Sequence, residues 1–427
     1  MSQLVSKALS ISIVILMMRA CVMACKFGLA IFIGRYLDLA SLGIYGLAAG
    51  AIAIGPVVIG MGMVHLIMRD AVTQSIGEMT EALRFYWGLT AWIYALLLLL
   101  TILLTIVAGI SIFWTIIVLI MLFEHLGNDI FHLFSNLERP ILANVSAFLR
   151  GAAWVLIYVP LALLDPGFRT LTALFGFWLA GSALAFVMFV FASRSWPWKS
   201  AFALPLRFEW AMRTIKQAFI IYISDLSFVA SQYVDRYLVS IFLGLELAGI
   251  YFLYWSVANA ATTLVSMTVL QLQRPLLIKA HHEGGAPAHR TLTSHLMKTT
   301  ALATVALTFA TGCAFLLLLP LLKQPAVAHH MTAFWLIMAG MAVRNIADFG
   351  AMALFTARRD HIMTYTNVAS VALLVTVQVA LMPLAGLYGA GAAILMTFAV
   401  VTLWRYRLIF VVPHPASDTG RPQRADA

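Results

Sequence analysis

Long apolar runs recur along this chain from one end to the other, and they limit what it can fold into. Breaking the sequence at its polar and Pro- or Gly-containing segments leaves twelve such runs, at approximately 8–33, 42–68, 87–108, 110–132, 140–164, 170–193, 215–241, 247–272, 297–322, 331–356, 361–383 and 386–411. About 20 apolar residues in a helix span the ~30 Å hydrocarbon core of a bilayer. Because 63% of the residues are hydrophobic and only 10% are charged, a soluble fold is excluded. The sequence predicts an all-α polytopic membrane protein with about twelve transmembrane helices.

The basic residues are divided unevenly between the two sets of loops. An even number of spans puts both termini on one side of the membrane. Nineteen Lys and Arg residues lie in or beside the termini and the even-to-odd loops, whereas the opposite loops hold only Arg35, Arg169 and Lys323. Cytoplasmic loops carry such an excess, so both termini are predicted to be cytoplasmic. The net charge of +10 then reflects this bias and attraction to anionic membrane lipids, and it gives no support for nucleic-acid binding.

The two halves of the sequence are similar when one is shifted by 206 residues. The shift aligns two short segments, namely Leu37, Leu39, Gly43, Ile44, Tyr45 and Leu47 with Leu243, Leu245, Gly249, Ile250, Tyr251 and Leu253. An offset of six helices is typical of a parallel repeat whose axis follows the membrane normal. We therefore predict an N-terminal six-helix bundle over 1–200, a C-terminal six-helix bundle over 201–411, a cleft between them, and a disordered cytoplasmic tail over 412–427. The alternative is that Gly-Ile-Tyr is a common tripeptide at helix starts and that the match arises by chance.

Four segments resemble a known superfamily. They are FIGRYLDLASLGIYGLAAGAIAI (32–54), FSNLERPILANVSAFLRG (134–151), YVDRYLVSIFLGLELAGIYFLYWSVANA (233–260) and GLYGAGAA (386–393), and they are similar to polysaccharide exporters of the multidrug/oligosaccharidyl-lipid/polysaccharide superfamily. The resemblance implies a MATE-like fold, a place in the bacterial inner membrane, and the function of a Wzx-type O-antigen flippase. Its substrate would be an undecaprenyl-pyrophosphate-linked oligosaccharide, moved from the cytoplasmic to the periplasmic leaflet. Implied partners are polysaccharide polymerase and chain-length proteins.

Two cations in the first span are the strongest candidates for substrate binding. Arg19 and Lys26 recur seven residues apart, with Ser12 before them, so the three share one helix face. A pyrophosphate offers clustered oxygens that an Arg fork can grip and a Lys can neutralise. In the alternative interpretation Arg19 pairs with Asp225, which the 206-residue shift places at the equivalent position.

Further ionisable residues lie within the seventh and tenth spans. Asp225 and Gln232 share a face; Asp225 is interpreted as an ion-coupling or proton site because it is taken as the deeper acid, and Gln232 as a substrate ligand. Arg344 and Asp348 are spaced to pair within one helix. They either lower the cost of insertion in this way or line the cavity, Arg344 as a substrate ligand and Asp348 as a second ion-coupling residue.

The remaining intramembrane charges are given structural interpretations. Arg150 is predicted to snorkel to the cytoplasmic boundary, and Asp235 with Arg236 to be either local groups at a helix end or substrate ligands. Boundary solvation is favoured over a metal site for the cluster that closes the fourth span, Glu124, His125, Asp129 and His132.

No catalytic, cofactor-binding or metal-binding signature appears in the sequence. The segment GGAPAHR (284–290) lacks the Lys-Ser/Thr of a phosphate-binding loop. A membrane polymerase or ligase is disfavoured because every predicted periplasmic loop is short. The other rivals are a MATE-type exporter of small molecules and a major-facilitator transporter. A cationic cavity disfavours organic cations, and the loop at 69–86 lacks the basic motif of the major facilitators.

Overall fold

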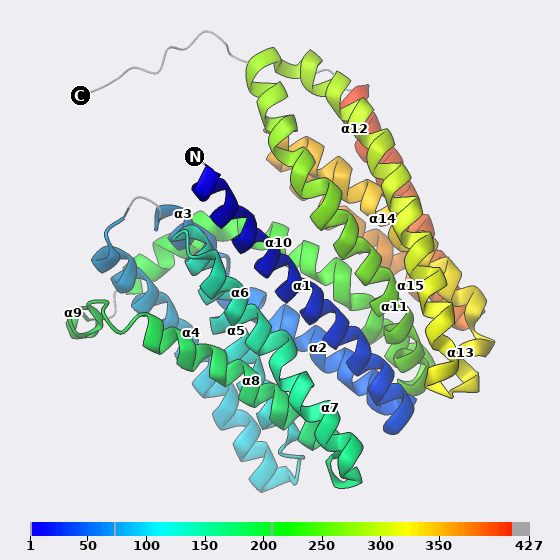
Figure 1. The fold of residues 1–427 in the computed structure, drawn as a ribbon, viewed down its shortest axis with the longest axis horizontal. Helices are drawn as coiled ribbons and strands as arrows, with labels where there is room; N and C mark the ends of the chain where they lie inside the picture. The colour runs from blue at the N-terminus through cyan, green and yellow to red at the C-terminus, as the bar shows by residue number, and fades with distance from the viewer. Residues whose placement is uncertain (1, 72–73, 206–207, 412–427) are drawn as a thin grey trace.

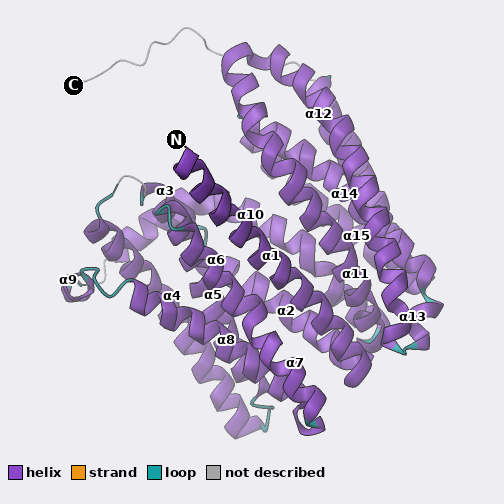
Figure 2. Ribbon diagram, viewed as in Figure 1, coloured by secondary structure: helices purple, strands orange, loops and turns teal. Residues whose placement is uncertain are grey.

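The computed structural model describes residues 2–71, 74–205 and 208–411, and within these ranges the chain is helical with no strand (Figure 2). The predicted tail over 412–427 lies outside them. The elements in chain order are α1 (Ser2–Tyr36), α2 (Leu39–Gly60), α3 (Met63–Asp70), α4 (Ile76–Ala108), α5 (Phe113–Asn136), α6 (Pro140–Phe148), η1 (Leu149–Ala153), α7 (Trp154–Leu164), η2 (Pro166–Phe168), α8 (Leu171–Ala192), α9 (Trp198–Ala203), α10 (Phe208–Leu243), α11 (Leu245–Val265), η3 (Ser266–Leu270), α12 (Gln271–Leu322), α13 (Pro325–His329), α14 (Met331–Thr356) and α15 (Asp360–Phe410).

The predicted number of membrane-length helices is confirmed for the described ranges. Nine continuous helical stretches there are long and apolar enough to cross a bilayer. Gly285 (φ 64°) divides the stretch that contains α12, and Gly386 (φ 55°) divides α15; a left-handed φ at these turns is readily adopted only by glycine. The 36-residue α10, which is more charged, completes the twelve. The start of α1 and the end of α15 lie at the same end of the molecule (Figure 1), as an even number of spans requires.

The second predicted span, 42–68, is not one helix. Met61 (φ 47°) and Gly62 (φ 71°) both adopt left-handed backbone conformations, and they separate α2 from α3. Tyr222 of α10 lies so close to Gly62 that a Cβ there would be 3.2 Å from the Tyr222 Cβ. The break therefore lets α3 turn against α10.

The equivalent helices α2 and α11 cross at equivalent glycines. A Cβ on Gly43 would overlap the Leu245 carbonyl oxygen, and a Cβ on Gly249 would overlap the Leu39 carbonyl oxygen. The shift of 206 residues relates Gly43 to Gly249 and Leu39 to Leu245, so the two contacts are reciprocal. The Gly-Ile-Tyr repeat thus marks the point where the N-terminal half of the chain (residues up to 200) meets the C-terminal half (from 201), and its glycines permit backbone contact.

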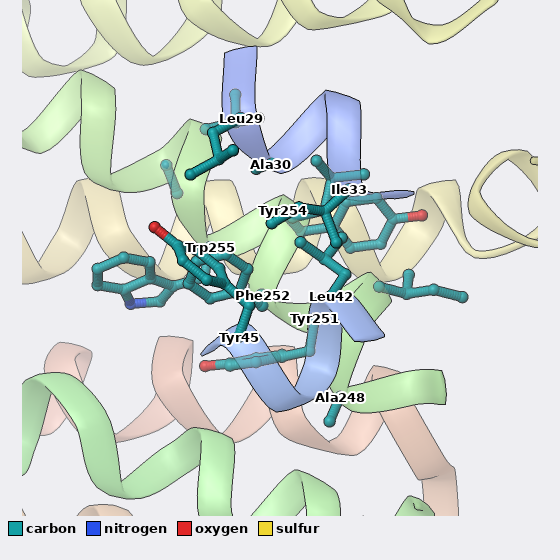
Figure 3. Packing of buried hydrophobic residues seen from close by; sticks show 14 of the residues in the cluster. Leu29, Ala30, Ile33, Leu42, Tyr45, Ala248, Tyr251, Phe252, Tyr254 and Trp255 are labelled. Carbon is teal, nitrogen blue, oxygen red and sulfur yellow. The ribbon is translucent and has the colours of Figure 1, made fainter. Parts of the chain in front are cut away.

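An apolar core surrounds this crossing, at the end of the molecule opposite the start of α1. Figure 3 shows side chains of α1, α2 and α11 packed together there, among them Leu29, Ile33, Leu42, Tyr45, Ala248, Tyr251 and Trp255. Two hydrogen bonds join the halves at this end, from Arg35 Nη1 to the Leu321 carbonyl (3.0 Å) and from Gln324 Nε2 to the Gly34 carbonyl (2.9 Å). The core and these bonds close this end of the molecule.

Candidate functional site

A cavity of about 680 Å³ lies between the halves of the chain. Residues of α1, α2, α5, α6, η1, α7 and α8 line it from the N-terminal half, and residues of α10, α11, η3 and α12 from the C-terminal half. Its inner end is formed by Tyr45 and Phe252, which belong to the apolar core. Met18, near the start of the first span, and Gln271, at the start of α12, line its opposite end. The cavity therefore extends toward the end of the molecule that carries the start of α1.

The charged side chains that line this cavity are four cations and one carboxylate, namely Arg19, Lys26, Arg150, Arg236 and Glu124. The prediction that Arg19 and Lys26 lie on one face of the first helix and line a cleft is confirmed in its geometry. The Arg19 Nε donates to Asn144 Oδ1 of α6 at 3.0 Å, while Lys26 is exposed to the open space. The cavity carries an excess of positive charge, which suits an anionic ligand.

Arg150 and Glu124 form a buried ion pair at the cavity wall. Arg150 Nη1 lies 2.7 Å from Glu124 Oε2, and both terminal nitrogens donate to Asn128 Oδ1 at 3.2 Å. Glu124 Oε1 also accepts hydrogen bonds from Trp178 Nε1 (3.0 Å) and Ser182 Oγ (2.7 Å). The prediction that Arg150 snorkels to the boundary is wrong, because this carboxylate and amide bind the two terminal nitrogens of the guanidinium inside the protein; Arg150 is only 8% exposed. Boundary solvation of Glu124 is wrong for the same reason.

Arg236 lies in an aromatic cage at the cavity, with 2% of its surface exposed. Its guanidinium carbon is 3.7 Å from the centre of the Trp255 ring and 4.6 Å from that of Tyr233. Nη1 donates to the Gly46 carbonyl at 3.3 Å, whereas Nε and Nη2 have no hydrogen-bond partner among the described residues. Of the two interpretations given to this residue, the geometry favours a role in the cavity. Both nitrogens are buried against the cage, so a ligand would reach them only after these ring contacts open.

Asp235 faces away from the cavity and is structural. Its carboxylate accepts hydrogen bonds from the Tyr251 hydroxyl and from the Arg236 backbone N–H (2.8 Å). Asp235 is 2% exposed, whereas the Asp225 side chain is 36% exposed. Asp235 is therefore the more buried of the two acids within the protein.

Asp225 contacts His65 and does not pair with Arg19. The Asp225 carboxylate lies 2.6 Å from His65 Nε2 of α3, and Arg19 bonds Asn144 instead. The alternative of an Arg19–Asp225 pair is wrong for this structure. The 206-residue shift gives Arg19 and Asp225 equivalent places in the two halves. Equivalent places are related by the axis of the repeat and need not be in contact. The break at Met61 and Gly62 is what turns His65 toward α10.

Gln232 and Arg344, the other two predicted substrate ligands, do not line the cavity. Arg344 is 4% exposed and donates to the Ser231 carbonyl (2.7 Å) and the Ser231 hydroxyl (2.8 Å), which ties α14 to α10. Its predicted contact with Asp348 exists at 3.9 Å. Between the two interpretations of this pair, the geometry favours the pair within one helix over cavity lining.

His125 and Asp129 are buried among the helices of the N-terminal half, so their predicted boundary solvation is wrong. Each is 3% exposed. His125 forms hydrogen bonds with the hydroxyls of Tyr86 (2.7 Å) and Tyr94 (3.1 Å), and Asp129 accepts one from Trp87 Nε1 (3.0 Å). Across the described ranges, no group of three or more His, Cys, Asp and Glu residues is arranged to hold a metal ion.

Comparison with known proteins establishes the fold. No protein-family model and no curated protein matches the sequence. Among solved structures, an inward-facing multidrug resistance MATE family transporter of the MOP superfamily superposes with a TM-score of 0.69 at 12% identity, covering 91% of this chain and 94% of that chain. The lipid II flippase MurJ in an inward closed conformation gives 0.66 at 13% identity, covering 94% and 88%. The MATE multidrug transporter DinF-BH gives 0.55 at 12% identity, covering 93% and 96%.

These likenesses define the class of protein. The chain is a multi-pass membrane protein with a MATE-like fold, as the sequence resemblance implies. An outward-facing MATE family transporter of the same superfamily superposes less well, with a TM-score of 0.52 at 13% identity, covering 86% of this chain and 85% of that chain.

Proposed function

We propose that this protein is a flippase that moves an undecaprenyl-pyrophosphate-linked oligosaccharide from the cytoplasmic to the periplasmic leaflet of a bacterial inner membrane. It would serve O-antigen or exopolysaccharide assembly, beside polysaccharide polymerase and chain-length proteins. The observation that carries the proposal is the cavity between the halves, lined by Arg19, Lys26, Arg150 and Arg236 against the single carboxylate of Glu124.

The cations of the cavity suit a pyrophosphate that must cross the membrane. An ion in hydrocarbon costs from several kcal/mol upward, so the protein has to supply a polar route. Arg236 has two donors without protein partners in the described chain, and Lys26 is a point charge exposed to the cavity. Arg19 can present its remaining N–H groups while Asn144 holds its Nε. The polyprenyl tail would stay in lipid during the passage.

The closed end of the cavity suits alternating access. The inner end is sealed by the core around Gly43 and Gly249, and the opposite end extends toward the predicted cytoplasmic side. Rocking of the two halves against each other would close the cytoplasmic side and expose the head to the periplasm. An inside-negative potential assists export of a net negative charge by about 2.3 kcal/mol per charge per 100 mV.

A small-molecule exporter on the same fold is the second candidate, because multidrug transporters are among the structural likenesses. The excess of cations in the cavity opposes organic cations as cargo and leaves anionic compounds. The two candidates differ in the consequence of deletion. Loss of a flippase strands lipid-linked oligosaccharide in the cytoplasmic leaflet, whereas loss of a small-molecule exporter leaves the lipid-linked oligosaccharide correctly distributed.

The test is complementation of a deletion strain with cavity variants, reading surface polysaccharide and membrane protein level together. We expect Arg19→Ala/Lys26→Ala to insert at normal abundance and to fail in transport, and Arg19→Lys to recover little because the planar fork is lost. Lys279→Ala, which removes an exposed cation outside the cavity, is the matched control and should behave as the wild type. Full transport by the double variant would overturn the proposal.

A further inference from the structure

A second cavity, of about 460 Å³, lies on the opposite side of the N-terminal half, between α4 and the short helix α9. Its lining is Arg84, Trp87, Gly88, Ala91, Trp92, Ala95, Trp198 and Phe202. None of these residues contributes to the cavity between the halves. Figure 1 shows α9 at the edge of the molecule, beside the first part of α4.

The floor of this groove is a row of small residues on α4. Gly88, Ala91 and Ala95 are spaced by three and four positions, which places them on one face of the helix. Trp87 and Trp198 form one wall, stacked with ring centres 6.2 Å apart and an interplanar angle of 12°. Trp198 is held in place by a hydrogen bond from its Nε1 to the Ser193 carbonyl (3.0 Å). The groove therefore has an ordered aromatic wall and an apolar floor.

One end of the groove carries a cation. The Arg84 guanidinium carbon lies 5.3 Å from the centre of the Phe85 ring and 5.6 Å from that of Phe202. The Arg84 Nη1 is buried and has no hydrogen-bond partner in the part of the chain that the structure describes. A buried donor without a partner costs free energy, so the site lacks an acceptor.

The long direction of the groove follows the axis of α4, with Arg84 nearer the start of the helix and Ala95 further into the membrane. A lipid in a leaflet has the same order of headgroup and acyl chain. Since α4 begins at Ile76, Arg84 lies about 12 Å along its axis and Ala95 about 16 Å further. Beyond the groove, Leu96, Leu99 and Leu103 are exposed on α4, as expected of a surface that faces hydrocarbon. Tryptophans gather at the level of lipid headgroups, and Trp87, Trp92 and Trp198 lie in the groove near Arg84.

We propose that this groove binds one anionic phospholipid of the leaflet on the α1-start side, with its phosphate at Arg84 and an acyl chain over Gly88, Ala91 and Ala95. Charge complementarity selects an anionic headgroup, since exposed Lys199 of α9 adds its positive charge to that of Arg84. The bound lipid also supports the interior, because Trp87 of the groove wall donates to buried Asp129 of α5. The lipid thus stabilises the packing of α4 on α5.

The test is native mass spectrometry of the detergent-purified protein titrated with phosphatidylglycerol, with phosphatidylcholine and with inorganic phosphate. We expect the wild type to bind one phosphatidylglycerol in preference to phosphatidylcholine, and inorganic phosphate to compete poorly because it lacks the acyl chain. Arg84→Gln should weaken the binding of phosphatidylglycerol by about tenfold or more, since it removes a charge-assisted hydrogen bond. Ala91→Trp should abolish binding by filling the groove.

Arg194→Gln is the matched control, because it removes an exposed cation of the same region that does not line the groove; it should bind as the wild type does. Melting temperatures without added lipid identify an unfolded Ala91→Trp, in which case Ala95→Leu takes its place. Equal binding of phosphatidylglycerol by the wild type, Arg84→Gln and the filled variant overturns the proposal. So does competition by inorganic phosphate at lipid-like concentrations, or a protein dimer that Ala91→Trp dissolves.

Discussion

The two halves of the chain share a repeat but use their buried cations differently. In the N-terminal half, Arg19, Lys26 and Arg150 all line the central cavity. In the C-terminal half, Arg344 is bound to Ser231, and Arg405 donates to the Ala347 carbonyl (2.8 Å), Thr366 and Asn367. Arg236 alone among the described cations of that half lines the cavity. A shared fold therefore fixes where helices cross, whereas the side chains decide which half presents charge to a ligand.

In the N-terminal half the buried cations line the cavity, and in the C-terminal half most of them tie helices together. Arg150 gives the most severe test of this difference, because it lines the cavity and is also paired in the interior. We expect Arg150→Ala to destabilise the protein by about 3–5 kcal/mol, since it leaves the Glu124 carboxylate buried without its cation. Membrane abundance and the melting temperature in detergent measure the loss. Combining Arg150→Met with Glu124→Gln should restore abundance while transport stays impaired.

The C-terminal counterpart is Arg405→Met, which should lower abundance through three lost hydrogen bonds. Transport per molecule of the remaining protein should be close to that of the wild type, because Arg405 does not line the cavity. If Arg150→Ala kept normal abundance, or if Arg405→Met lost transport at normal abundance, the division between the halves would be wrong.

The crossing of α2 and α11 gives a test of intermediate size. Gly249→Ala should cost about 1–3 kcal/mol as an overpacked contact, because the new Cβ meets the Leu39 carbonyl oxygen. Gly43→Ala should have a similar effect, since its contact is the reciprocal one. A cysteine placed in the central cavity should become more accessible to a thiol reagent added from the periplasmic side in both variants. Gly176→Ala, where a Cβ would meet nothing within 4 Å, is the control.

The contact between His65 and Asp225 gives the smallest expected effect on stability. Both side chains are more than a third exposed, so Asp225→Asn should change the free energy of unfolding by no more than about 1 kcal/mol. We still propose Asp225 as the ion-coupling residue, with Asp348 as a second candidate. Asp225→Asn should then abolish flipping driven by a pH gradient at normal abundance, measured in proteoliposomes. Unchanged pH dependence would remove Asp225 from the mechanism.

Sequence alone predicted those features that depend on one helix at a time. Apolar length predicted the membrane helices, and seven-residue spacing placed Arg19 and Lys26 on one face of α1. The repeat predicted where equivalent helices begin, and the two glycines that it aligned proved to be in contact. Such patterns are carried by local geometry, so they can be found without knowledge of how the helices pack.

Features that depend on the rotation of one helix against another were missed. Glu124 was predicted to be solvated at a boundary although it pairs with Arg150 inside the protein. A signal was present for this pair, because Glu124 and the only Lys or Arg of the next predicted span, Arg150, lie at comparable depths in adjacent spans. No signal showed that the break at Met61 and Gly62 would direct His65 toward Asp225.

The glycine crossing lies near one end of α2, so α2 can pivot about this point. From Gly43 to Gly60 the helix extends about 26 Å, so a rotation of about 20° about the crossing displaces the far end by about 9 Å. The cavity mouth can therefore widen and narrow while the backbones at the crossing stay in contact. A head group could enter at one end without loosening the other, and ions would have no leak path across the membrane during loading.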